Sequence, residues 1–181
     1  LVGRSDFLEL GASFTNIITS GTVIGAGTEV AGIIGYLGGG TLSNAINEAS
    51  VTAAGNNTGG VVGLIDVSQV VTNRYNIGDV SGPDNVGGLI GVMNINSTAT
   101  QIVTLSNSYN TGMVSGTGSN VGGVVGLAEV GDSSVLGAQI DNVFWDISTS
   151  GISAGTGNAG VTGKGNLRGG CFGNTTCGTA T

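Results

Sequence analysis

The chain contains no histidine, and it is poor in the other residue types on which catalysis and charge-driven binding depend. Charged residues make up 8% of its 181 residues, with four basic residues against eleven acidic ones. The resulting net charge of −7 provides no basic patch for a phosphate backbone, so we expect no nucleic-acid partner. The acidic residues are scattered along the chain, whereas an active site needs carboxylates clustered on one face. We therefore expect no enzyme.

Proline and long apolar runs are also scarce. A single proline among 37 glycines excludes a collagen helix. No apolar run approaches the ~18 residues of a transmembrane helix, so we expect no membrane span. The abundant Val, Thr, Ser, Asn and Gly residues favour short strands joined by tight turns.

Two cysteines, Cys171 and Cys177, lie close together near the C-terminal end. With no histidine nearby they are too few to hold a metal ion. A local disulfide is the favoured interpretation, and it predicts an oxidising, extracellular environment; a pair of free thiols is the alternative. Because the chain begins at Leu1 without a signal-peptide pattern, we expect a mature or trimmed segment.

A sequence repeat dominates most of the chain. An aliphatic pair between glycines recurs at residues 32–35, 60–63, 88–91 and 123–126. A second block is centred on an asparagine and is followed two residues later by Ile, Tyr or Phe. Its asparagines are Asn16, Asn44, Asn73, Asn107 and Asn142.

The spacing of the two blocks shows where the repeat tolerates insertions. From each of the first four asparagines to the next glycine block there are 16, 16, 15 and 16 residues. From the end of a glycine block to the next asparagine there are 9, 10, 16 and 16 residues, so insertions fall on one side of the unit, within 93–102 and 129–138. A solenoid accepts insertions at one corner while its other strands keep register.

The sequence therefore predicts an all-β fold, a parallel β-helix (β-solenoid) of about five coils with three short strands per coil. Each coil takes 28 to 35 residues, the spacing of successive asparagines in the repeat. We expect the solenoid to cover residues 1–163, followed by a Gly-rich tail over 164–181 that carries the Cys171–Cys177 loop.

Strict alternation along the asparagine block predicts which side chains face the core. If the residues two positions after each asparagine point inward, the asparagines do too, and the intervening residue is exposed. That intervening residue is Ile17, Ala45, Arg74, Ser108 or Val143, and a column containing Arg is expected to face solvent. The inward asparagines would then form a structural ladder of stacked amides, each bonded to the same residue one coil away.

The glycine-aliphatic blocks leave two alternatives open. In a straight strand one residue of each aliphatic pair points outward, which gives an apolar association stripe of Ile33, Val61, Leu89 and Val124. If a corner falls inside the block, both residues of each pair turn inward. The second alternative is slightly favoured.

Several of these segments resemble a known family. Asn85–Gly91 and Asn120–Gly126, together with Ser106–Gly112, resemble the GLUG motif of bacterial surface proteins. Asn142–Asp146 is similar to the segment that closes such arrays, and the resemblance covers residues 28–163. It implies a secreted or surface-anchored β-solenoid, as in adhesins of the filamentous-haemagglutinin type, with no common catalytic residue.

The expected function is accordingly structural or adhesive, as a stalk, fibre or matrix segment at the cell surface. Expected partners are neighbouring repeats or other copies end to end, and a host or matrix glycan or protein. A glycan-binding module that uses the insertion loops is the alternative, and a carbohydrate-active enzyme is a remote one. We expect no cofactor; a surface calcium ion at Asp66, Asp132 or Asp141 is a weaker alternative, because the glycine-aspartate motif of calcium-binding β-rolls is missing.

Overall fold

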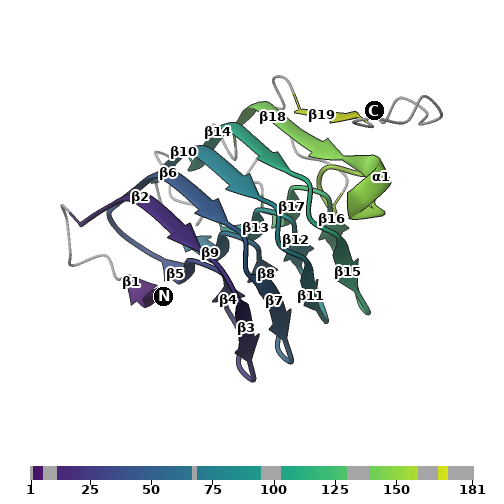
Figure 1. The fold of residues 1–181 in the computed structure, drawn as a ribbon, viewed down its shortest axis with the longest axis horizontal. Coiled ribbons are helices and arrows are strands. Elements are labelled where there is room, and N and C mark those ends of the chain that lie inside the picture. Colours follow the sequence, from purple (N-terminus) through teal and green to yellow (C-terminus); the bar gives the residue numbers. More distant parts are fainter. Residues whose placement is uncertain are drawn as a thin grey trace.

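The computed structural model describes residues 2–5, 12–66, 69–94, 103–129, 139–158 and 167–170. Within these ranges the chain is almost entirely β-structure, wound into four parallel sheets (Figure 1). The parallel β-solenoid predicted from the repeat is confirmed.

Two of the sheets contain most of the long strands. In order, the five-stranded sheet consists of β1 (Val2–Ser5), β5 (Ile34–Leu37), β9 (Val62–Asp66), β13 (Ile90–Asn94) and β17 (Val125–Ala128). The six-stranded sheet consists of β19 (Leu167–Gly170), β18 (Gln139–Asp146), β14 (Val103–Asn110), β10 (Gln69–Asn76), β6 (Thr41–Asn47) and β2 (Ser13–Thr19).

The other two sheets have four short strands each. One contains β15 (Val114–Gly116), β11 (Val80–Gly82), β7 (Ser50–Ala53) and β3 (Thr22–Gly25). The other contains β16 (Val121–Gly122), β12 (Val86–Gly87), β8 (Thr58–Gly59) and β4 (Val30–Ala31).

Each complete coil therefore contributes one strand to each of four sheets, and the prediction of three strands per coil is wrong. The glycine-aliphatic block, taken as a single strand from the sequence, contains a corner. A two-residue strand such as β4 ends before Gly32 and Ile33, and β5 starts at Ile34 in a different sheet.

The corner also decides how the aliphatic pairs are oriented. Ile33, Val61, Leu89 and Val124 are all fully buried, and so are the residues that follow them. The outward apolar stripe is therefore wrong, and the alternative with both residues inward is right. These residues belong to one continuous hydrophobic core that also includes Leu42, Val71 and Leu105 of the six-stranded sheet.

A second correction concerns the asparagine block. Asn16, Asn44, Asn73, Asn107 and Asn142 all have left-handed backbone angles, with φ between 49° and 61°. Asparagine adopts this conformation more readily than other residues with a side chain. In β6, Ser43 and Asn44 both lie on the outer side, so the alternation changes phase at the asparagine, as at a β-bulge.

The change of phase reverses the predicted inward and outward columns. Ala45, Arg74, Ser108 and Val143 are buried, whereas the asparagines are exposed or, at Asn73, half-buried. The Ile, Tyr and Phe residues that follow the asparagines by two positions therefore lie on the outside of the six-stranded sheet. The asparagine ladder exists, but it is on the surface.

A different set of asparagines is buried. Asn47, Asn76 and Asn110, which we call the inner asparagine ladder, are fully buried at the ends of β6, β10 and β14. Asn47 Nδ2 donates to Asn76 Oδ1 at 2.7 Å, and Asn76 Nδ2 donates to Asn110 Oδ1 at 2.7 Å. These residues follow the outer asparagines by three positions, a spacing that is visible in the sequence and was not used.

Glycine at the corner makes room for the inner ladder. A Cβ on Gly88 would overlap the Asn110 side chain and the carbonyl oxygen of Gly123, and Gly60 stands in the same relation to Asn76. The first glycine of the glycine-aliphatic block is therefore required by packing between successive coils.

We expect Gly88→Ala to lower the free energy of unfolding by about 2 to 3 kcal/mol, because the added methyl group must displace backbone and a buried amide. Gly27→Ala is the matched control, since no atom lies within 4 Å of a Cβ built there. Urea unfolding followed by circular dichroism measures both variants. Equal stability of the two would contradict this account of the corner.

The last coil is closed differently from the others. After β18 the chain forms a single helical turn, α1 (Ile147–Ser150), with Asp146 as its N-cap and Gly151 in a left-handed conformation after it. Trp145 is buried, and its Nε1 donates to the carbonyl oxygen of Ile152 at 2.8 Å. β19 then pairs with β18, so the six-stranded sheet extends past residue 163 into the segment expected to be a tail.

Some expectations fall on parts of the chain that the structure does not describe. Cys171, Cys177 and Asp132 lie outside the described residues, as does most of each expected insertion. The described strands do place both insertions at one corner, between the five-stranded and six-stranded sheets. Among the described residues, no helix is long and apolar enough to cross a membrane.

Candidate binding face on the six-stranded sheet

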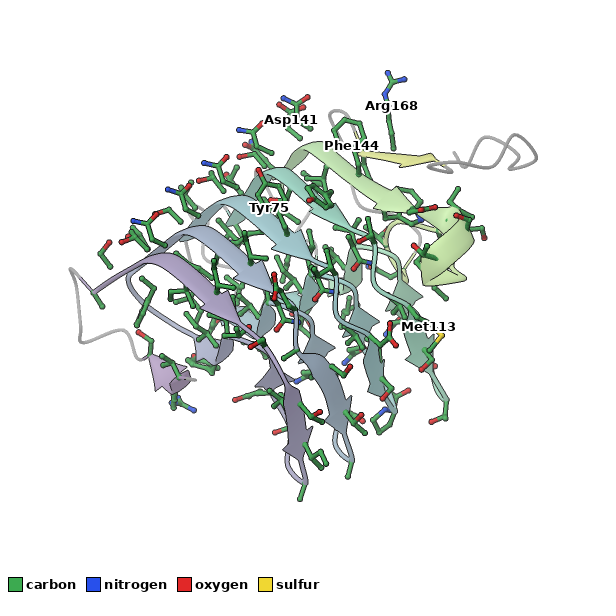
Figure 2. The ribbon with its side chains drawn as sticks, viewed as in Figure 1. Tyr75, Met113, Asp141, Phe144 and Arg168 are labelled. Atoms are coloured by element: carbon green, nitrogen blue, oxygen red, sulfur yellow. The ribbon has the colours of Figure 1, made fainter. Side chains whose placement is uncertain are left out.

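The outer surface of the six-stranded sheet presents an exposed column of large apolar side chains. Parallel register aligns one such residue from each of β2, β6, β10, β14 and β18; we call Ile18, Ile46, Tyr75, Tyr109 and Phe144 the apolar column. Ile18 is 65% exposed, and Tyr109 and Phe144 are 38% and 39% exposed. Figure 2 shows Tyr75 and Phe144 on the outside of the sheet.

Two aromatic members of this column, Tyr75 and Tyr109, are in contact with each other. The ring centroids of Tyr75 and Tyr109 are 4.4 Å apart, with an angle of 39° between the ring planes. The contact restricts both rings, while Tyr109 stays exposed and Tyr75 half-buried. The column is therefore an ordered apolar surface.

The outer asparagine ladder (Asn16, Asn44, Asn73, Asn107 and Asn142) runs beside the apolar column. Asn44 Nδ2 donates to Asn16 Oδ1 at 3.3 Å, and Asn73 Nδ2 donates to Asn44 Oδ1 at 3.1 Å. At the other end, Asn142 Nδ2 donates to Asn107 Oδ1 at 3.4 Å. An amide has two N–H donors and two acceptor lone pairs, so an amide bonded once on each side, like Asn44, retains one donor and one acceptor.

A shallow groove lies along the part of these two columns that β2, β6 and β10 contribute. Its volume is about 550 Å³, and it is lined by Asn16, Ile18, Asn44, Ile46, Asn73 and Tyr75. The groove thus combines apolar side chains with amides, the composition typical of sites that bind small or extended ligands. A third column, of Thr15, Ser43, Thr72 and Ser106, lies on the other side of the ladder and adds hydroxyl groups.

Among the residues that the structure describes, the charged ones in these columns are at the far end of the face. Arg168 of β19 pairs with Phe144 and continues the apolar column, and Asp141 of β18 continues the hydroxyl column. Both side chains point away from the body of the molecule (Figure 2). Between Asn16 and Tyr109 the three columns consist of uncharged residues.

Three described carboxylates, among them the calcium candidate Asp66, accept hydrogen bonds that hold parts of the fold together. Asp66 accepts hydrogen bonds from the Tyr36 hydroxyl at 2.8 Å and from Asn94 at 3.2 Å. Asp79 and Asp84 accept from backbone N–H groups of the next coil, those of Met113 and Ser119. Within the described part of the chain, no three His, Cys, Asp or Glu residues come together in a group able to hold a metal ion.

Arg74, expected from the sequence to face solvent, is instead buried, and among the described residues it is the ionisable side chain whose buried nitrogens have no hydrogen-bond partner. It is fully buried in β10, and its Nε, Nη1 and Nη2 atoms have no hydrogen-bond partner. Burial lowers the pKa of Arg74 to about 9, because the charged form loses its hydration. The small residues on either side, Ala45 and Ser108, leave room for the long side chain in the core.

Comparison with known proteins supports the fold. Neither a protein-family model nor a curated protein sequence matches the chain. A crystal structure from Bacteroides ovatus, of a protein named a putative immunoglobulin A1 protease, is similar with a TM-score of 0.63 and 22% sequence identity. The similarity covers 92% of this chain and 52% of that one, so the chain spans about half the length of its structural neighbour.

Proposed function

We propose that the chain is a structural and adhesive β-solenoid segment of a secreted or surface-exposed bacterial protein, part of a stalk, fibre or matrix. The observation that carries this proposal is the repetition itself. Each coil joins the next through four parallel strand pairings and through asparagine ladders, and the same polar and apolar groups recur on the surface of successive coils. This architecture builds length and an extended surface.

The resemblance of the repeats to GLUG motifs supports the location at a bacterial surface. The structural neighbour, a bacterial protein of about twice the matched length, supports a role as part of a larger chain. Its name refers to proteolysis, which would require a nucleophile and base brought together by the fold. The carboxylates described above instead accept hydrogen bonds that hold neighbouring coils, which favours a structural role.

Surface labelling tests the proposal. Antibodies raised against the segment should label intact cells of the bacterium that makes it, or detect it in the medium, and external protease should remove the signal. Confinement to the cytosolic fraction would overturn the proposed location. Cleavage of immunoglobulin A1 by the purified segment would overturn the non-enzymatic role.

A further inference from the structure

We propose that the outer face of the six-stranded sheet binds an extended, uncharged polysaccharide that lies across successive coils. This goes beyond the structural role, and it rests on the pairing of the apolar column with the outer asparagine ladder. It differs from a site on the insertion loops, since the residues concerned all belong to described strands.

The length and the aromatic rings of the apolar column suit the binding of a sugar chain. Its five side chains are spaced by the strand separation of ~4.8 Å, so the column is roughly 19 Å long. One side of a pyranose ring carries mainly C–H groups, and such a ring packs on an aromatic side chain in the way that other apolar groups do. Tyr75, Tyr109 and Phe144 provide consecutive aromatic rings on the outer face for this contact; Tyr109 and Phe144 are exposed, and Tyr75 is half-buried.

The asparagine ladder supplies the polar half of the recognition. A sugar hydroxyl both donates and accepts hydrogen bonds, and so does an amide. The ladder holds its amides in place from coil to coil, because Asn44 is bonded to both Asn16 and Asn73. Held side chains lose little conformational entropy when a ligand binds, which favours affinity.

The charge of the face and of the chain favours a neutral polysaccharide over an acidic one. The described residues that line the groove are all Asn, Ile or Tyr, and the whole chain carries a net charge of −7. A polyanion such as an acidic polysaccharide would be repelled at low salt, while a neutral one would not. A peptide strand would gain little here, because the backbone groups of β6, β10 and β14 are already paired on both sides.

Binding to a panel of neutral hexasaccharides tests the proposal, with cellohexaose, chitohexaose, xylohexaose, mannohexaose and laminarihexaose as probes in isothermal titration calorimetry. At least one should bind with a dissociation constant of millimolar or below. The double variant Tyr75→Ala/Tyr109→Ala should weaken that binding by about tenfold or more, since it removes two stacking surfaces.

The control variant also removes an exposed apolar side chain, but from a different sheet. Ile24 in β3 is 80% exposed, and Ile24→Ala should leave the affinity unchanged. Circular dichroism verifies that each variant keeps the β-solenoid. As a second probe of the same face, Asn44→Gly retains the left-handed backbone and removes one amide of the groove, so it too should weaken binding.

Three outcomes would overturn the inference. They are no binding by any member of the panel, equal binding by the tyrosine double variant and the Ile24→Ala control, and self-association in sedimentation that the double variant abolishes. The last result would assign the face to a second copy of the chain. None of these outcomes bears on the surface location, which the labelling experiment tests separately.

Discussion

Asn76→Leu should lower the free energy of unfolding by about 4 kcal/mol, because it removes the middle amide of the inner ladder. Asn76 is fully buried and makes three hydrogen bonds through its amide. It accepts from Asn47 Nδ2 at 2.7 Å and donates to Asn110 Oδ1 and to the carbonyl oxygen of Gly78, each at 2.7 Å. Leucine leaves a buried N–H of Asn47 without an acceptor, and each such loss costs about 1 to 3 kcal/mol.

The matched control lies on the outer ladder. Asn44 is exposed and also bonds to one asparagine on each side, but water can replace both bonds when its amide is removed. Glycine tolerates its left-handed φ of 54°, so Asn44→Gly should cost less than about 1 kcal/mol. Urea unfolding followed by circular dichroism compares the two. If both variants lost the same free energy of unfolding, burial would not explain how much the inner ladder stabilises the fold.

Arg74→Met should raise the stability of the protein, on the order of 3 kcal/mol at pH 7. The guanidinium is fully buried with no hydrogen-bond partner, whereas Met keeps much of the apolar length of the side chain without the charge. A buried charge without a partner is among the most costly groups a core can contain. Arg168→Met, at an exposed position in β19, should change stability little.

The pH dependence gives an independent measurement of the same cost. Burial lowers the pKa of Arg74 from its ordinary high value to about 9 in the folded protein, so above pH 9 the unfolded chain binds more protons than the folded one. The penalty is therefore complete below pH 9 and is relieved as the pH rises above 9. The stability difference between Arg74→Met and the wild type should be smaller at pH 10.5 than at pH 7. A difference that stays constant over this interval would show that the guanidinium is satisfied in the folded protein.

The sequence predicted the solenoid because repetition is a property of the chain as a whole. The constant distance from asparagine to the glycine block, and the variable distance after it, located the insertions correctly. The number of strands per coil was wrong because a strand of two residues, such as β4, leaves no alternation to detect. The strand ends there because the glycine backbone that follows it packs closely against the neighbouring coil.

The candidate face was missed for a single reason. Strict alternation was applied across Asn44 and its equivalents, although a left-handed residue changes the phase of a strand. The error moved Tyr75 and Tyr109 from the surface into the expected core, and it moved Arg74 out of the core. Asparagine at the same place in every repeat was the available signal, because asparagine is enriched at left-handed positions.

The equivalence of successive coils has a consequence for how such a protein can evolve. The coils that contain β6, β10 and β14 each have an inner asparagine, a corner glycine and a buried aliphatic pair, so one of these coils can follow another. Duplication or deletion of the DNA that encodes one coil therefore changes the length of the protein without requiring a new interface. The same event adds one strand to the six-stranded sheet. The length of the protein and the number of contacts that its outer face can make therefore increase together.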